Sequence, residues 1–235
     1  MSPIVHTVRM TTVPVEFEHT LSQLLDRWRI DWTSVQLGML RAHFESLLEA
    51  NSRMNLTRIT NPIEAAVKHY ADSLALLLWI RDRGIEVGTL LDVGSGAGFP
   101  AVPLAVMRPE WQVTALDGTA KKIGFIERVV ETLRLPNLRA VHAHSAHWRE
   151  GRPADVVTVR AVAKLAKCLR DTADFVAPNG WLVAYKTTDI SDDELSEAQL
   201  QCGDSGFRSE PPFKYELPLK DDRLQRALQS FRKTR

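Results

Sequence analysis

A glycine-rich turn directly after a short β-prone run is the feature that most constrains this fold. The run 89–93 favours a strand, and Gly94, Gly96 and Gly98 follow it at alternate positions. Glycines in such a turn allow positive φ and let a ligand approach the backbone without meeting a Cβ atom. Because open α/β sheets bind ligands at the carboxyl ends of their strands, the turn predicts a ligand-binding loop at the end of the first strand.

Beyond this turn, strand-like runs alternate with amphipathic segments of helix length. Strands are expected at 113–116, 138–143, 155–159 and 181–185, and helices near 98–107, 119–133 and 161–175. Repeated βα units of this kind form a mainly parallel sheet, and apolar strand runs indicate burial on both faces. We therefore predict an α/β fold: a doubly wound, mainly parallel sheet with helices on both faces.

Helical periodicity dominates the chain before residue 85. Asn61 followed by Pro62, with Glu64 three positions after the asparagine, predicts the start of a helix that runs toward Leu78. Two earlier helices are indicated by apolar residues at helical spacing, Phe17, Leu21, Leu24, Leu25 and Trp28, and then Leu37, Leu40, Phe44, Leu47 and Leu48. We expect residues 1–84 to form a helical N-terminal region packed on the core, and residues 85–235 to form the ligand-binding α/β domain.

The last part of the chain carries weaker signals. A late strand is predicted around 215–217, and the pattern of 217–235 resembles a helix with a basic tail. The run Glu210, Pro211, Pro212 and Phe213 falls after the fifth strand and indicates an ordinary turn.

Composition indicates a chain that can bury its own core. With 235 residues and 44% hydrophobic content, no disulfide or metal is needed for stability. Cys168 and Cys202 have no partners at metal-ligand spacing, and two cysteines in this length suit a reducing compartment. The longest apolar run, 74–80, is too short to span a bilayer. We expect a cytoplasmic monomer with no metal and no membrane partner.

Charges are strongly segregated along the chain, although the net charge is only +1. Residues 121–170 contain 11 Lys or Arg against 4 Asp or Glu, whereas residues 187–225 contain 4 against 10. A basic middle attracts a phosphate backbone through Coulomb attraction and counterion release. Solvated helix faces would give the same pattern, so charge alone leaves nucleic-acid binding open.

The acidic residue Asp117 sharpens the interpretation of the glycine turn. It ends the next predicted strand, 19 positions after Gly98, where a carboxylate can accept hydrogen bonds from ribose hydroxyls. The spacing G-x-G-x-G places Phe99 where a nicotinamide-binding loop has its last glycine, which favours S-adenosylmethionine over NAD. This hypothesis requires Asp117 to lie close to Gly94 and Gly96. A tight turn with no ligand is the alternative.

Several separated motifs, in the order found here, resemble those of the 16S ribosomal RNA guanine-N7 methyltransferase family, also called the glucose-inhibited division protein B family. The longest is DVGSGAGFPAVPLAVMRPEWQVTALDGTAKKIGFIERV at 92–129. The others are NSRMNLT at 51–57, VKHYADS at 67–73, DVVTVRAVA at 155–163 and AYK at 184–186. The resemblance covers roughly residues 17–186.

The resemblance implies a class I methyltransferase-like fold, S-adenosyl-L-methionine as methyl donor, and 16S rRNA or the small ribosomal subunit as partner. The residues that it implies for cofactor binding are Asp92, Gly94, Ser95, Gly96, Gly98, Phe99, Asp117, Ser145, Ala146 and Arg160. It implies catalytic roles for Arg160 and Lys186, and RNA contacts for Asn55, His69, Lys121 and Lys122.

Methylation at guanine N7 fits the residues present, because this nitrogen already carries an in-plane lone pair and no general base is required. Differences from the family pattern at His144, Ala146 and Thr187 keep a small-molecule methyltransferase as the alternative. A third hypothesis is a non-enzymatic RNA-binding module on the same scaffold, against which the intact glycine turn and Asp117 argue.

Overall fold

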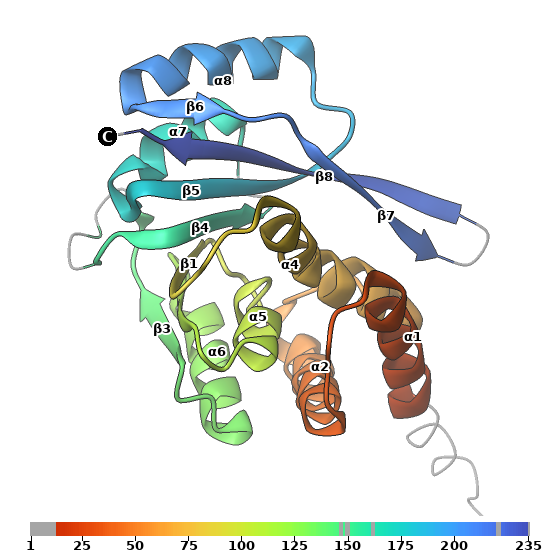
Figure 1. Cartoon of the computed structure of the whole chain (residues 1–235). Helices are drawn as coiled ribbons and strands as arrows, with labels where there is room; N and C mark the ends of the chain where they lie inside the picture. Colours follow the sequence, from red (N-terminus) through yellow and green to blue (C-terminus); the bar gives the residue numbers. More distant parts are fainter. Residues whose placement is uncertain (1–12, 146–147, 149–150, 161–162, 220–221, 235) are drawn as a thin grey trace, which may run out of the picture.

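The computed structural model describes residues 13–145, 148, 151–160, 163–219 and 222–234 (Figure 1). Within these residues the strands form an eight-stranded sheet, in which β3-β2-β1-β4-β5-β8-β6 is the path and β7 pairs with β8. The first five strands in this order run parallel, and β8 is antiparallel to β5, β6 and β7. The bounds of the parallel strands are β1 Thr89–Val93, β2 Gln112–Asp117, β3 Leu138–His142, β4 Ala154–Arg160 and β5 Val176–Thr187.

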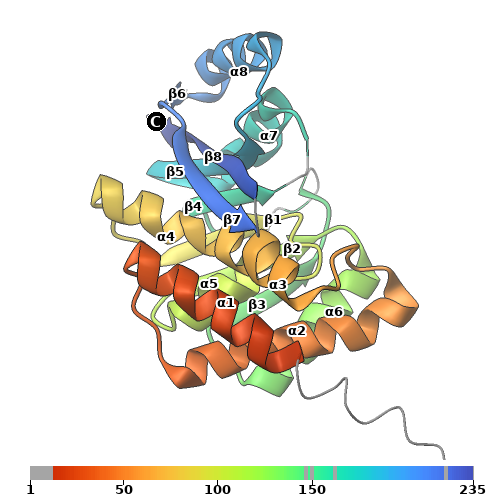
Figure 2. The same ribbon diagram turned by 90° about the vertical axis from the view of Figure 1, so that its right-hand side faces the viewer.

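Alternate residues of the central strands serve two separate cores. Leu90 and Val156 belong to a core that includes the N-terminal helices, α5 (Ala101–Met107) and α6 (Ala120–Leu133), whereas Leu91 and Val157 face α7 (Leu165–Thr172) and α8 (Asp192–Ser205). Figure 2 shows the strands between the two groups of helices. The predicted doubly wound α/β fold with helices on both faces is confirmed.

The N-terminal region is helical, as predicted. It comprises α1 (Val13–Trp28), α2 (Ser34–Met54), α3 (Pro62–Ala65), the π-helix η1 (Ala66–Ala71) and α4 (Asp72–Arg83). The Asn61 side chain caps the third helix by accepting a hydrogen bond from the Glu64 N–H at 3.0 Å, and Gly84 ends α4 in the left-handed conformation. The spacing of apolar residues in the sequence does not distinguish this π-helical turn from an ordinary α-helix. Because these helices share one core with the sheet, the division at residue 84 stays a prediction.

No helix among the described residues combines the length and the apolar character that crossing a membrane requires.

The prediction of a helix over 217–235 was wrong. After β6 (Phe207–Ser209), the segment 210–212 leads into β7 (Phe213–Leu219), and β8 (Asp222–Lys233) follows. The predicted turn over Glu210–Phe213 was also wrong, because β6 and β7 pair one after the other, in the same direction, with β8. The middle of β8, from Ala227 to Phe231, is buried, because this strand lies inside the sheet with neighbours on both sides. A strand covered on both faces has no alternation of polar and apolar residues, so this segment carries no strand signal of its own.

Replacement of Leu228 tests the observed role of β8. Leu228 is fully buried, so Leu228→Ala should lower the free energy of unfolding by about 2–5 kcal/mol. The matched change Leu200→Ala, at a leucine of α8 that is 77% exposed, should stay within about 0.5 kcal/mol. Urea unfolding measures both, and equal losses would contradict the burial of β8.

Candidate functional site: a cofactor pocket beside a cationic pocket

The glycine turn and Asp117 meet at the carboxyl ends of β1 and β2. Asp117 Oδ2 accepts a hydrogen bond from the Gly96 N–H at 3.0 Å, and Oδ1 accepts from the Thr119 N–H at 2.8 Å. The Lys122 ammonium lies 3.6 Å from Oδ2. The predicted closeness of Asp117 to the glycine turn is therefore confirmed, and the turn holds this nearly buried carboxylate in a fixed orientation.

A pocket of about 360 Å³ opens at this point. Four residues predicted to bind the cofactor line it, namely Gly94, Asp117, Ser145 and Arg160, together with Lys122 and His144. The predicted contact Ala146 lies outside the described residues. A pocket at the carboxyl ends of adjoining parallel strands is the usual ligand position in this class of sheet. We call this space the cofactor pocket.

Asp92 lies near the end of β1, just before the glycine turn. Its side chain is completely buried, and Oδ1 accepts a hydrogen bond from the Thr158 hydroxyl at 2.9 Å. The Ser95 hydroxyl donates to the Asp92 carbonyl at 3.0 Å. Burial raises the pKa of the Asp92 carboxyl to about 6. These contacts fix the strand end from which the glycine turn begins.

Phe99 follows the glycine turn and packs against the N-terminal helical region. The His69 ring stacks on the Phe99 ring with centroids 4.7 Å apart, and the Tyr70 ring meets it edge-on at 5.1 Å. The Arg160 guanidinium carbon lies 5.7 Å from the same centroid. Residues from three motifs far apart in the sequence therefore form one aromatic and cationic cluster.

Arg160 ends β4 and binds the π-helix. Its Nη2 donates to the Lys68 carbonyl at 2.9 Å, and Nη1 donates to the Ser73 hydroxyl at 3.1 Å. Its Nε lies 3.3 Å from Asp72 Oδ2. With 17% of its side chain exposed, the guanidinium lines the cofactor pocket while most of its N–H groups are held by η1 and α4.

The two predicted RNA contacts of the helical region occupy different environments. His69 is largely buried, and its Nε2 lies 2.8 Å from the Thr57 hydroxyl. Burial, followed by the nearby Arg160 charge, lowers the pKa of His69 to about 3, so the ring is neutral at physiological pH. Asn55 is exposed and ends α2 in the left-handed conformation with φ +50°.

A second pocket, of about 380 Å³, adjoins the first and shares Arg160 with it. Lys68, Lys186 and Arg226 also line it, so four cationic side chains surround one space. Asp72 is the carboxylate in this lining, and it already accepts a hydrogen bond from the Tyr215 hydroxyl at 2.7 Å and pairs with Arg160. Lys186 donates to Glu194 at 2.6 Å and to the Ala163 carbonyl at 3.2 Å. We call this space the cationic pocket.

Sequence reasoning missed Arg226 and His43. Arg226 lies in the segment expected to be helical, and β8 brings it opposite Thr187. His43 lies among the apolar positions of α2 and resembles a core residue, yet its Nε2 lies 3.0 Å from the Ala97 carbonyl in the glycine turn. The Tyr70 hydroxyl lies 3.0 Å from His43 Nδ1. Neither role has a local sequence signal, because each depends on contact between distant segments.

The two adjacent lysines that were predicted to contact RNA, Lys121 and Lys122, have different neighbours. Lys122 faces Asp117 at the cofactor pocket, whereas exposed Lys121 donates to the Met54 carbonyl at the end of α2, at 3.5 Å.

Residues 36–212 match the protein family GidB, described as rRNA small subunit methyltransferase G. The chain belongs to this family. Two GidB relatives carry the name ribosomal RNA small subunit methyltransferase G. The one from Leuconostoc citreum (strain KM20) is 32% identical over 211 residues, covering 87% of each chain. The one from Microcystis aeruginosa is 34% identical over 213 residues, covering 86% of this chain and 94% of the relative. The predicted family and methyltransferase class are confirmed.

A solved structure supports the fold assignment of this GidB chain. The crystal structure of M. jannaschii TYW2 in complex with AdoMet matches with a TM-score of 0.52 and 16% identity, over 66% of this chain and 75% of that one. At this level of identity the similarity shows the fold, and it confirms the class I methyltransferase-like arrangement.

Alanine at Gly98 tests the strained geometry of the turn. Gly98 has φ +91°, and an added Cβ would lie 2.5 Å from Val102 Cγ2. Gly98→Ala should therefore lower the free energy of unfolding by more than about 1 kcal/mol. Gly38→Ala in α2, where an added Cβ meets no atom within 4 Å, should raise it by about 0.4–1 kcal/mol. Urea unfolding that ranks the two variants in the opposite order would refute this geometry.

The buried histidines predict how stability changes with pH. The folded-state pKa is about 4 for His43, through burial, and about 3 for His69, against 6.5 for each in the unfolded chain. The pKa values of both histidines are lower in the folded state than in the unfolded chain. Their contribution to the free energy of unfolding is therefore fully present above pH 6.5, and it is lost as the pH falls toward the folded-state pKa values. Between pH 6.5 and 4, His43→Gln should reduce the slope of unfolding free energy against pH by up to about 1.4 kcal/mol per unit. An unchanged slope in urea unfolding at several pH values would contradict the neutral, buried state of His43.

Proposed function

We propose that this chain transfers a methyl group from S-adenosyl-L-methionine to N7 of a guanine in 16S rRNA of the small ribosomal subunit. The observation that carries the proposal is that the cofactor pocket and the cationic pocket share Arg160. A methyl donor bound at the glycine turn and a phosphate-bearing methyl acceptor bound in the cationic pocket would therefore both lie next to the Arg160 guanidinium. Membership of the GidB family supports the same substrate class.

The residues around the cofactor pocket fit S-adenosyl-L-methionine. Asp117 would accept hydrogen bonds from the ribose hydroxyls, since its carboxylate lines the pocket. Asp92 is completely buried and does not line the pocket, so its proposed contribution to cofactor binding is to hold the glycine turn through the hydrogen bond from the Ser95 hydroxyl to its carbonyl. Gly94, Ser95, Gly96 and Gly98 leave the backbone open to a close approach, and Phe99, Ser145 and Ala146 complete the proposed contacts.

The proposed reaction needs alignment more than proton transfer. When bound, S-adenosyl-L-methionine would supply an electrophilic sulfonium methyl group. The guanine N7 lone pair would take this methyl group while the carbon–sulfur bond breaks, and S-adenosyl-L-homocysteine would leave. Arg160 and Lys186 would orient the acceptor nucleotide through its phosphate or its base edge, because both cations line the cationic pocket. Their existing partners hold them in place before the substrate arrives, which reduces the entropy lost on binding.

The proposed RNA contacts differ in their surroundings. Asn55 and Lys121 are exposed and able to approach a sugar-phosphate backbone. Lys122 would bind phosphate beside the cofactor ribose, and His69 would act mainly by holding Phe99 and Thr57 in position. We further propose that the protein acts as a monomer in the cytoplasm, where its substrate is assembled.

Labelled methyl transfer tests the proposed function. The purified chain with labelled S-adenosyl-L-methionine should modify 16S rRNA or small subunits that lack the mark, and nucleoside analysis should identify N7-methylguanosine. Asp117→Ala should weaken cofactor affinity at least tenfold by calorimetry, because the ribose hydroxyls would have no carboxylate to accept their hydrogen bonds. Label at another position of the nucleoside, or no label in either substrate, would overturn the proposal.

Salt dependence distinguishes the small-molecule alternative in the same assay. Binding of RNA should weaken steeply as salt rises, whereas binding of a neutral metabolite should hardly change. The cluster of cations around the second pocket favours a phosphate-bearing acceptor.

A further inference from the structure

The ammonium group of Lys186 is held by two acceptors at the cationic pocket. Lys186 lines this pocket near the carboxyl end of β5, and its side chain is 21% exposed. Its Nζ donates to Glu194 Oε1 at 2.6 Å and to the Ala163 carbonyl at 3.2 Å. A lysine ammonium has three N–H donors, and these are its two acceptors within the described residues. One donor is therefore left for a ligand in the cationic pocket.

Glu194 lies in the first turn of α8 and lines neither the cofactor pocket nor the cationic pocket. Its side chain is 18% exposed. The oxygen that pairs with Lys186 also accepts a hydrogen bond from the Leu165 N–H at 3.0 Å. Leu165 is the first residue of α7, so this N–H has no acceptor within its own helix. Two donors from different elements therefore fix the Glu194 carboxylate.

The sequence around Glu194 has the pattern of a capping box, but the structure uses the glutamate differently. Ser191 is the N-cap of α8, and its hydroxyl accepts a hydrogen bond from the Glu194 N–H at 3.3 Å. In a capping box the glutamate side chain would accept a hydrogen bond from the N-cap N–H in return. Here the carboxylate instead accepts from Lys186 and Leu165, outside its own helix. The contact with Lys186 has no signal in the sequence pattern.

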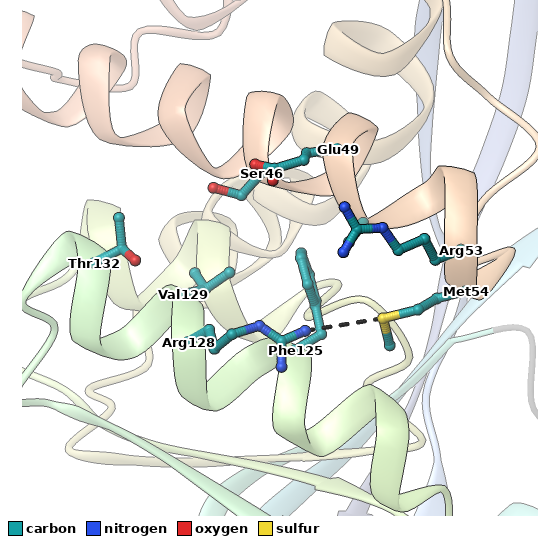
Figure 3. A pocket seen from close by; sticks show the side chains of 9 residues that line it. Ser46, Glu49, Arg53, Met54, Phe125, Arg128, Val129 and Thr132 are labelled. Atoms are coloured by element: carbon teal, nitrogen blue, oxygen red, sulfur yellow. Dashed lines mark hydrogen bonds between the residues drawn. The ribbon is translucent and has the colours of Figure 1, made fainter.

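Other basic side chains that line pockets of this chain are held less firmly. A further pocket, of about 410 Å³ between α2 and α6, is lined by Arg53 and Arg128 (Figure 3). Both arginines are exposed, and the Arg128 Nη2 donates to the weak acceptor sulfur of Met54 at 3.8 Å. A long side chain without a strong partner keeps most of its rotamer freedom. The fixed position of Lys186 is therefore produced by its partners, of which Glu194 is the charged one.

We propose that Glu194 is a positioning residue for methyl transfer, which holds the Lys186 ammonium at the cationic pocket with one N–H left for the methyl acceptor. This inference rests on the proposed function for the role of Lys186. An ammonium that is fixed before the acceptor binds loses little rotamer freedom on binding. A larger fraction of the bound complexes then has the geometry that methyl transfer requires. Glu194 itself would touch neither the acceptor nor the cofactor.

Replacement of Glu194 by glutamine tests this role. Glu194→Gln keeps the length of the side chain and an oxygen that can accept the Leu165 N–H, but it removes the negative charge that holds Lys186. With small subunits that lack the mark as substrate, kcat should fall at least fivefold. KM for S-adenosyl-L-methionine should stay within twofold, since Glu194 does not line the cofactor pocket. Urea unfolding verifies that the variant is folded.

Glu197→Gln is the matched control on the same helix. Glu197 pairs with Lys164, the N-cap of α7, at 3.2 Å, so both glutamates connect α8 with the start of α7. The Glu197 pair is exposed, at 49% for the glutamate and 65% for the lysine, and neither residue lines the cofactor pocket or the cationic pocket. Glu197→Gln should therefore leave kcat within twofold of the unaltered chain.

A measurement without substrate reports whether Glu194 holds Lys186. Trace acetylation with acetic anhydride, followed by mass spectrometry, should modify Lys186 at least threefold faster in Glu194→Gln than in the unaltered chain, relative to the exposed Lys121. The reason is that a nitrogen held at 2.6 Å by a carboxylate is shielded from the reagent. Glu197→Gln should leave the acetylation rate of Lys186 unchanged.

The variant Lys186→Ala separates positioning from a general structural effect. Adding Glu194→Gln to Lys186→Ala should change kcat by less than twofold, because the lysine through which Glu194 acts is absent. An equal fivefold loss in both backgrounds would show that Glu194 acts on the fold and would overturn the inference. If Lys186→Ala has no measurable turnover, the acetylation rate and the Glu197 control decide.

The outcomes distinguish this inference from the proposed function. If the unaltered chain transfers no methyl group to rRNA or to small subunits, the proposed function fails, whatever the acetylation rates. If the unaltered chain is active, the positioning role is overturned by an unchanged kcat in Glu194→Gln, by an equal loss in Glu197→Gln, or by an unchanged acetylation rate of Lys186. Each of these three results leaves the proposed function intact.

Discussion

The bonds of Arg160 are the constraint on which the rest of this site depends. Its guanidinium ends β4 of the sheet, and its hydrogen-bond acceptors belong to η1 and α4 of the N-terminal region. A largely buried cation must have partners, because an unpaired charge away from water is strongly destabilising. The sheet and the helical region are therefore joined at the point where the cofactor pocket and the cationic pocket meet. The helical region is part of the site and does more than cover the core.

The π-helix supplies acceptors at this junction. The carbonyls of Lys68 and His69 both accept hydrogen bonds from Arg160, and the His69 ring stacks on Phe99 at the end of the glycine turn. Single π-helical turns often occur at functional sites, since the wider turn displaces backbone groups from their usual partners. The glycine turn has a second contact of this kind, because His43 lies within hydrogen-bond distance of the Ala97 carbonyl and the Tyr70 hydroxyl lies within hydrogen-bond distance of His43. These contacts connect the helical region directly to the glycine turn.

The charges that are segregated along the sequence are distributed over both faces of the sheet in the structure. Lys121, Lys122 and Arg128 lie on α6, on the face that carries the N-terminal helices, whereas the acidic residues of α8 lie on the opposite face. Part of this acidic segment has a structural role, because Glu194 accepts hydrogen bonds from Lys186 and from the Leu165 N–H. The α8 face also carries Lys167 and Arg170 of α7, so acidic and basic side chains are mixed on that face.

The sequence by itself determined the alternating strands and helices, the cap at Asn61 and the closeness of Asp117 to the glycine turn, because each follows from local periodicity or from the geometry of one βα unit. It also identified the family through motifs that remain contiguous. Only the tertiary structure decided that 222–233 is a strand and that Arg226 joins Lys68 and Arg160 around one pocket. The physical reason is that such arrangements unite residues far apart in the chain, whose pairing depends on how whole elements pack and leaves no pattern in their neighbours.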